Sequence, residues 1–328
     1  MRKNSLSYFQ YIYYYVMEEK TEDLKSDAES IEPKYKNLVF SGGSIRGICH
    51  VGALQRLVDE KLVEIKKIKA IAGVSAGCLF AVLLVLGFTV EEIWHFILSL
   101  DLKKTVKPDF FMLLKKCGID NGHIIYNLYE QILTKKTGIK HINFKQLYEI
   151  TGIYLTIVGS CLTTKKAVFF NHVNTPYFKV SVAVRISISM PGFFTPVVVD
   201  NKKYIDGAIL NNFPMELFSD QLDETIGIIN HEEYDTNFEF PEQYFMAVIN
   251  LFMHQYYGKS AEKYKENTIV VSANITNVNI FNFNLDTETK HKLYKCGYDC
   301  ANEFIKTQLK SVPNKDEDAP HKIEEGDF

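Results

Sequence analysis

The sequence predicts an α/β fold of three layers, in which helices cover both faces of a mostly parallel central sheet. Three observations lead to this fold class. Short apolar runs typical of buried strands alternate with segments of helical periodicity over about 270 residues. Two of these runs end in glycine-rich turns that lead directly into helices. The hydrophobic share of 46% is ample for the core that such a sheet requires.

Each element follows from a local pattern. Strands are short apolar runs bounded by turn residues, and we predict them at residues 37–40, 68–72, 153–161, 167–171, 197–200, 203–205, 225–230 and 268–272. Helices show apolar side chains on one face and capping residues, and we predict them at residues 48–62, 79–86, 89–100, 123–136, 143–151, 177–187, 242–257 and 286–309. One example of a cap is the capping box Thr89-Val90-Glu91-Glu92. Residues 108–116 form a short amphipathic segment between these helices.

The chain divides into one large domain with an extension at each end. We assign residues 1–36 to an N-terminal extension and linker, residues 37–309 to the α/β domain, and residues 310–328 to a charged, disordered tail. The apolar stretch Leu6–Met17 lacks a following cleavage site and is shorter than a membrane span. It is either an element packed on the domain or an anchor at a membrane interface.

Charge and cysteine usage exclude several classes of protein. A net charge of −3 argues against a nucleic-acid-binding protein, which is usually basic. The six cysteines occur in a long chain without a clear secretory signal, which indicates reduced thiols and a cytoplasmic location. Cys296 and Cys300 share a helix face, but no His/Cys pair accompanies them at the spacing of a zinc site.

The turn Gly73-Val74-Ser75-Ala76-Gly77 places a serine between a predicted strand and a predicted helix. This arrangement is typical of a nucleophile elbow, because the small neighbours permit a sharp turn and leave the hydroxyl accessible to a carbonyl substrate. The positive end of the following helix dipole would face any anion that forms there. The motif by itself is only moderately specific, since ordinary strand–helix turns also contain it.

The loop Gly42-Gly43-Ser44-Ile45-Arg46-Gly47 lies at the first strand–helix junction, where backbone N–H groups converge. A dinucleotide site is disfavoured by Ser44, and a P-loop is excluded because no Gly-Lys-Ser/Thr follows. The remaining functional interpretation is an oxyanion hole. Gly42 and Gly43 would donate N–H groups, and Arg46 would fix the loop or add positive potential. A purely structural tight turn is the alternative.

No base lies next to Ser75 in the sequence, so its partner must come from elsewhere in the fold. Two of the nine histidines, His231 and His254, would fit the order serine, acid, histidine, but no motif supports either. Asp206 ends a predicted strand and precedes Gly207, and a partly desolvated carboxylate can itself act as the base for a serine hydroxyl.

Taken in order, these motifs resemble the patatin-like phospholipase family. The matching segments are the glycine-rich loop at residues 41–47, the elbow at 73–77, the Pro-Gly-Phe block at 187–194, the Asp-Gly motif at 206–208 with Asn212 and Pro214, and the closing helix at 292–298. The resemblance spans about residues 37–305, and the first four of these motifs, which occur in the family's order, make it highly specific.

The resemblance implies a patatin-like hydrolase with a Ser-Asp dyad and no catalytic histidine. Ser75 would attack the ester carbonyl, Asp206 would accept its proton, and Gly42, Gly43 and Ser44 would hold the oxyanion. The supporting residues would be Arg46, Gly73, Gly77 and Gly207. No metal or cofactor is implied. The chain departs from the family pattern at Ser44, where many members have a third glycine, so the backbone there is more restricted.

The expected function is therefore that of a lipid acyl hydrolase of the phospholipase A or lysophospholipase type, which cleaves phospholipid or lysophospholipid through a Ser75 acyl-enzyme. A triacylglycerol lipase or a transacylase would use the same dyad, and a catalytically silent lipid-binding protein is the alternative from another class. We expect peripheral membrane contact through apolar segments such as residues 6–17 or Phe110–Leu114. Head group, acyl position and oligomeric state have no signal in the sequence.

Overall fold

The computed structural model describes residues 32–231, 244–245, 247–249, 251, 260–273 and 285–310. Its central element is a sheet with the strand order β10-β9-β1-β2-β4-β8-β7, in which β5 also pairs with β4. The strands of this sheet are β1 Asn37–Phe40, β2 Ala70–Val74, β4 Tyr154–Cys161, β5 Lys166–Phe170, β7 Val197–Val199, β8 Lys202–Asp206, β9 Thr225–His231 and β10 Thr268–Ser272. A second, two-stranded sheet joins β3 Gly118–Asp120 to β6 Gly192–Phe194.

The sheet is mixed, with a parallel block that contains β10, β9, β1, β2 and β4. Strands β5, β7 and β8 run antiparallel to their neighbours. The expectation of a three-layer α/β fold with a mostly parallel sheet is therefore confirmed. The predicted hairpin between β7 and β8 is also present, but its turn is Asp200-Asn201, one residue earlier than the expected Asn201-Lys202. Both turn residues have positive φ, as a two-residue hairpin turn of this kind requires.

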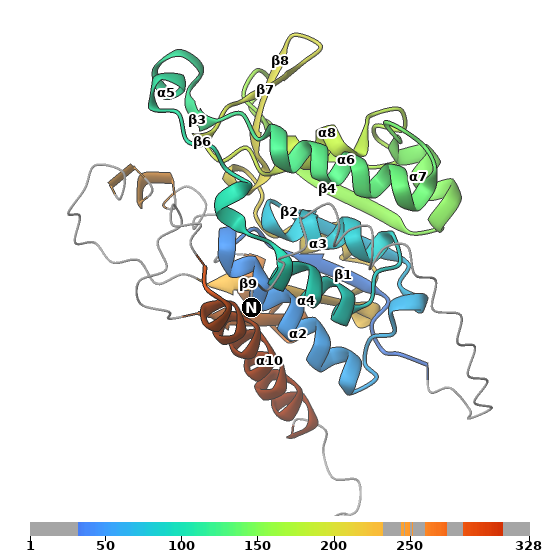
Figure 1. Cartoon of the computed structure of the whole chain (residues 1–328). Helices are drawn as coiled ribbons and strands as arrows, with labels where there is room; N and C mark the ends of the chain where they lie inside the picture. Colours follow the sequence, from blue (N-terminus) through green and yellow to red (C-terminus); the bar gives the residue numbers. More distant parts are fainter. Residues whose placement is uncertain are drawn as a thin grey trace, which may run out of the picture.

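Helices cover the sheet in the arrangement shown in Figure 1. They are α2 Ile48–Asp59, α3 Ala76–Val85, α4 Val90–Ser99, α5 Phe110–Lys116, α6 His123–Thr137, α7 Phe144–Thr151, α8 Val180–Ser187 and α10 Thr287–Lys310. The opposite face of the sheet is covered by a thinner layer, in which Phe213, Met215 and Tyr264 pack against Val39 and Ala72. None of the helices in the described ranges has both the length and the apolar content of a membrane span.

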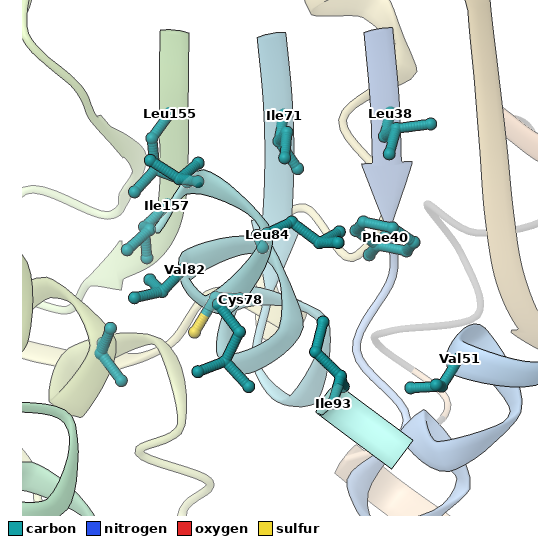
Figure 2. Close-up of a cluster of buried hydrophobic side chains, with 14 of the residues drawn as sticks. Leu38, Phe40, Val51, Ile71, Cys78, Val82, Leu84, Ile93, Leu155 and Ile157 are labelled. Carbon is teal, nitrogen blue, oxygen red and sulfur yellow. The ribbon is translucent and has the colours of Figure 1, made fainter. Parts of the chain in front are cut away.

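The main core lies between the parallel strands and α3. Figure 2 shows Leu38 and Phe40 of β1 and Ile71 of β2 on the side of the sheet that faces this helix. Side chains on successive residues of a strand point to opposite faces, so Val39 belongs to the cluster on the other side. Helix α3 is nearly all apolar because most of its surface is covered, and its residues Cys78, Val82 and Leu84 are almost fully buried.

Several predicted boundaries differ from the structure. Helix α8 begins at Val180 instead of residue 177, because Lys179 forms an extended bridge with Asn143 that precedes the helix. Helix α2 ends at Asp59, where Lys61 with φ 57° turns the chain back before Leu62. The short strands β3 and β6 were not predicted. The predicted features at residues 6–17 and 311–328, and most of the helix at 242–257, lie outside the described residues.

Helix α10 closes the fold by packing directly on α2. A methyl group at Gly52 would lie 1.9 Å from the carbonyl oxygen of Tyr294, and one at Gly297 would lie 1.9 Å from the carbonyl oxygen of Cys49. The two backbones therefore touch where neither helix has a side chain. Lys290 adds a polar attachment, because its buried ammonium group donates to the carbonyl oxygens of Ile97 and Leu100 at the end of α4.

Gly52→Ala and Gly297→Ala test this crossing, because two physical effects predict opposite signs. Helix propensity alone would stabilise either variant by about 0.5–1 kcal/mol. The clash at the crossing predicts a loss of about 1–3 kcal/mol instead, measured by urea unfolding, together with faster proteolysis within residues 285–310.

Gly138→Ala is the control, since a methyl group there meets open space and costs only backbone strain at φ 74°. It should leave α10 as resistant to protease as it is in the wild type. Greater stability of both α10-contact variants would contradict the close crossing.

Candidate active site

Strand β4 brings Ser75 and Asp206 together by its hydrogen-bond register. Strand β2 pairs with β4 up to Val74 opposite Val158, and β8 pairs with the next part of β4 from Asp206 opposite Gly159. Strand β5 pairs with residues 157–161 and overlaps both partners, so it occupies the other edge of β4. Strands β2 and β8 thus share one edge and meet end to end. Their meeting point places the residue after β2 beside the last residue of β8.

The two side chains are joined by a hydrogen bond. Oγ of Ser75 donates to Oδ2 of Asp206 over 2.7 Å, and the backbone N–H of Ala208 donates to Oδ1 over 2.9 Å. Asp206 is fully buried and Ser75 is 8% exposed. Burial raises the pKa of Asp206 from 3.8 to about 7, and the hydrogen bonds from Ala208 and Ser75 offset this only in part. A carboxylate with such a pKa can exchange a proton near neutral pH.

Ser75 sits at a strained turn. Its φ of 50° and ψ of −123° lie in a region that residues other than glycine rarely adopt. The backbone N–H of Ser75 donates to Oγ of Ser187 over 2.9 Å, which helps to hold this conformation. The adjacent glycines permit close packing, since a methyl group at Gly77 would lie 2.6 Å from the carbonyl oxygens of Phe40 and Ser41. The elbow predicted from the sequence therefore has the expected geometry.

The remaining predicted glycines also lie at close approaches of backbone segments. A methyl group at Gly73 would lie 2.6 Å from Cα of Cys78 in α3, which would prevent the tight return of the chain into that helix. One at Gly207 would lie 2.3 Å from the carbonyl oxygen of Val158 on β4. Both positions therefore require the smallest residue. They hold the ends of β2 and β8 against their neighbours.

The end of α8 positions both members of the pair. Ser187 accepts the N–H of Ser75, and two residues later the carbonyl oxygen of Ser189 accepts the N–H of Asp206 over 2.9 Å. Buried Arg185 fixes this segment by donating to Oγ of Ser189 and to the carbonyl oxygens of Asn121 and Thr195. Sequence reasoning matched this block to the family but gave these side chains no role. The local signal was the alternation of Ser187 and Ser189 with apolar residues before Pro191-Gly192.

The glycine loop lies beside Ser75, but it differs from the expectation at one residue. The N–H of Gly42 already donates to Oδ1 of Asn212 over 2.9 Å, so in this arrangement it is not free to bind an oxyanion. Ser44 has φ 51°, the left-handed conformation that a third glycine would adopt without strain. The N–H of Arg46 donates to the carbonyl oxygen of Gly43 over 2.9 Å and closes the turn.

The buried side chain of His50 contacts the backbone at the start of this loop. His50 is fully buried, and its Nε2 lies 2.9 Å from the carbonyl oxygen of Ser41, directly before the first glycine. The same nitrogen lies 3.0 Å from Nδ2 of Asn230, so Nε2 either donates to Ser41 or accepts from Asn230, depending on the tautomer. Burial lowers the pKa of His50 to about 4, so the ring is neutral at physiological pH. The N–H of Asn230 donates to Oγ of Ser41 over 3.0 Å. Sequence reasoning placed His50 on a helix without assigning it this role.

Neither of the two histidines considered as alternative bases is shown to contact Ser75 in the described part of the chain. His231 ends β9 and is paired in register with Ser272 of β10. His254 lies outside the described residues. The carboxylate partner of the Ser75 hydroxyl in the structure is thus Asp206, the residue that the sequence had indicated.

An apolar cavity opens beside Ser75. Ser44, Ser75 and Thr105 contribute hydroxyl groups to its lining, while most of the wall consists of aliphatic and aromatic side chains. These come from several elements, including Leu79 and Phe80 of α3, Ile97 of α4, Ile125 of α6 and Phe193 of β6. A long hydrocarbon chain fits such a lining better than a polar or charged ligand does.

A comparison with known protein families matches the part of the chain that contains these site residues. The model of the patatin-like phospholipase family matches residues 38–219, which is more than half of the chain and contains Ser75 and Asp206. The chain belongs to this family. The expected resemblance is therefore confirmed, and the glycine loop, the elbow and the Asp-Gly motif all lie inside the matched region.

Individual relatives agree with this membership. Protein R571 of Acanthamoeba polyphaga mimivirus is 33% identical over 287 residues, which cover 84% of this chain and 95% of that protein. The probable lipid hydrolase 463L of Invertebrate iridescent virus 6 is 32% identical over 192 residues, or 57% of this chain and 65% of that protein. The crystal structure of VipD from Legionella pneumophila has a TM-score of 0.50 at 19% identity and covers 90% of this chain and 73% of its own. This last likeness concerns the fold alone.

Comparing Ser75→Gly with Ser75→Ala isolates the strain at the elbow. Both variants lose the hydrogen bond to Asp206, but only glycine relaxes at φ 50°. We expect the glycine variant to be the more stable by about 1 kcal/mol in urea unfolding. The same pair of substitutions at Ser99, at the end of α4, should give the reverse order, because alanine is favoured in a helix. Equal stabilities at Ser75 would argue against strain.

Asp206→Asn tests the buried carboxyl group through the pH dependence of stability. The folded-state pKa of about 7 lies above the ordinary value of 3.8, so the folded protein retains this proton in the interval where the unfolded chain has lost it. The group therefore stabilises at low pH, and this contribution is lost as the pH rises towards 7. The difference in Tm, variant minus wild type, should be more positive at pH 8 than at pH 5. A difference that is independent of pH would contradict the raised pKa.

Proposed function

We propose that the protein is a lipid acyl hydrolase that cleaves fatty-acyl esters of phospholipids or lysophospholipids, with Ser75 as nucleophile and Asp206 as base. The observation that carries this proposal is the 2.7 Å hydrogen bond from Ser75, which lines an apolar cavity, to the buried Asp206. Membership of the patatin-like phospholipase family supports the substrate class, and so does the relative described as a probable lipid hydrolase. Residues 37–309 would form the catalytic domain.

The first half-reaction forms an acyl-enzyme. As Oγ of Ser75 attacks the ester carbonyl, its proton passes to Oδ2 of Asp206 along the existing hydrogen bond. The negative charge develops on the carbonyl oxygen, and we assign its stabilisation to the N–H groups of Gly43 and Ser44, since that of Gly42 is held by Asn212. The carbon–oxygen bond to the leaving alcohol then breaks. Asp206 returns the proton to that alcohol.

The second half-reaction releases the fatty acid. Asp206, again ionised, takes a proton from a water molecule that attacks the acyl carbonyl. The tetrahedral intermediate collapses, and Oγ of Ser75 leaves with the proton. A pKa of about 7 suits both directions of transfer, because the carboxyl group is neither a very weak base nor a very weak acid at neutral pH.

The apolar cavity would bind the acyl chain. Each methylene group moved from water into such a lining gains about 0.8 kcal/mol, so a long chain is held mainly by the wall and not by polar contacts. Triacylglycerol hydrolysis and transacylation use the same acyl-enzyme and differ only in the leaving group or in the acceptor. A lipid-binding protein without activity would keep the cavity but would not form the covalent intermediate.

The proposal predicts that Ser75→Ala and Asp206→Asn each reduce fatty-acid release from phospholipid vesicles by at least about a thousandfold, because each removes one half of the proton-transfer pair. His231→Ala should retain activity and serves as the control. Activity of the wild type should rise with pH through about 7, as Asp206 becomes ionised. Parallel assays with a triacylglycerol emulsion and with an added alcohol acceptor compare the alternative substrates.

Labelling with a fluorophosphonate probe, followed by mass spectrometry, shows whether Ser75 is nucleophilic at all. Absence of labelling together with lipid binding would replace the enzyme by a silent lipid-binding protein. An active Asp206→Asn variant together with an inactive histidine variant would overturn the dyad.

A further inference from the structure

Helix α5 exposes large apolar side chains instead of burying them. Phe110, Phe111 and Leu114 are 73%, 78% and 86% exposed, and no residue of the helix is buried. Figure 1 shows this short helix projecting from the body of the molecule, with β3 and β6 at its base. A cluster of adjacent apolar side chains this exposed is typical of a surface that contacts a partner or a membrane.

The segment around α5 is anchored firmly at its base. The N–H of Asp109 donates to the carbonyl oxygen of Ile119 over 2.7 Å, and the N–H of Lys107 donates to Oδ2 of Asp120 over 2.5 Å. Asp109 also caps the helix by accepting the N–H of Phe111 over 2.9 Å. The exposed side chains are therefore presented on an ordered loop with a closed base.

The same segment borders the cavity beside Ser75. Thr105, which precedes α5, is buried and lines that cavity. Strand β3, which follows α5, pairs with β6, and Phe193 and Phe194 of β6 line the cavity as well. Whatever α5 contacts is thus brought next to the cavity.

Lysines flank the apolar cluster along the chain. Lys103, Lys104, Lys107, Lys115 and Lys116 are all exposed. The acidic side chains within the same stretch are Asp101, which pairs with Lys104 over 3.0 Å, and Asp109, which is engaged in the helix cap. Apolar side chains flanked by lysines match the two chemistries of an anionic bilayer, whose acyl region lies beneath a layer of phosphates. A second copy of this surface would instead place like charges opposite each other.

We propose that residues 103–116 are a docking element for an anionic lipid bilayer. Phe110, Phe111 and Leu114 enter the boundary between head groups and acyl chains, and the lysines contact lipid phosphates. The proposal does not depend on ester hydrolysis. It goes beyond the proposed function by naming the surface through which the protein reaches a membrane.

Vesicle flotation with the full chain tests the proposal. Flotation measures binding and not hydrolysis, and the Ser75→Ala background removes the proposed nucleophile, so that lipid turnover does not accompany binding. We expect binding to phosphatidylcholine vesicles that contain 30% phosphatidylserine, at least tenfold weaker binding to pure phosphatidylcholine, and loss of binding as salt is raised, because screening weakens lysine–phosphate attraction.

Two sets of substitutions separate the apolar and the charged contributions. Phe110→Asp/Phe111→Asp/Leu114→Asp and Lys103→Glu/Lys115→Glu/Lys116→Glu should each reduce binding at least tenfold. Both sets change exposed side chains, so Tm and hydrolysis of a soluble short-chain ester in the Ser75 form should stay as in the parent. Leu309→Asp, at an exposed apolar residue of α10, and Lys61→Glu/Lys66→Glu/Lys140→Glu, at exposed lysines elsewhere, are the matched controls and should bind normally.

Several outcomes would overturn the docking element. Unchanged binding by the α5 variants, or equal losses in the controls, would exclude residues 103–116 as the contact. Loss of binding only when residues 1–31 are deleted would assign the contact to the N-terminal extension. A change from dimer to monomer in the aspartate variant, measured by light scattering with vesicle binding intact, would make this surface an interface between copies.

Discussion

One edge of β4 determines the distance between Ser75 and Asp206. Strand β2 occupies that edge up to Val158 and β8 occupies it from Gly159, so the ends of two strands that approach from opposite directions meet there. The 2.7 Å hydrogen bond between the side chains follows from this backbone register. Because backbone pairing is rigid, neither side chain needs a long reach or a mobile loop to find the other. A slip of β8 by one residue would turn Asp206 to the other face of the sheet.

Most of the polar groups around Ser75 and Asp206 form hydrogen bonds with backbone groups and so fix the backbone conformation. The hydroxyl of Ser187 orients the elbow, the carbonyl of Ser189 fixes the end of β8, and Asn212 holds the N–H of Gly42. The carboxyl group itself receives few hydrogen bonds for a buried ion, which is why burial dominates its pKa. Additional hydrogen-bond donors to the carboxylate would lower that pKa and make Asp206 a weaker base. The sparse surroundings of Asp206 are therefore part of its chemistry.

The sequence predicted what is encoded locally. Strand–turn–helix junctions, the elbow at Ser75 and the hairpin of β7 and β8 all depend on neighbouring residues, and the structure contains them, with the hairpin turn one residue earlier than predicted. Pairing of Asp206 with Ser75 was inferred through family resemblance, because nothing within either segment specifies contact across 131 residues. The hydrogen bond from Gly42 to Asn212 and the strands β3 and β6 were missed for the same reason. Each is formed by segments far apart in the chain.

The crossing of α2 and α10 has a consequence for the order of folding. Helix α2 follows directly on the glycine loop, yet the face at Gly52 is covered only by the last described helix of the chain. Strand β1 likewise lies between β2, which follows it closely, and β9, which is translated much later. During synthesis, the elements that carry the nucleophile therefore emerge from the ribosome long before their neighbours do. The nascent chain must complete its C-terminal part before this half of the sheet is enclosed.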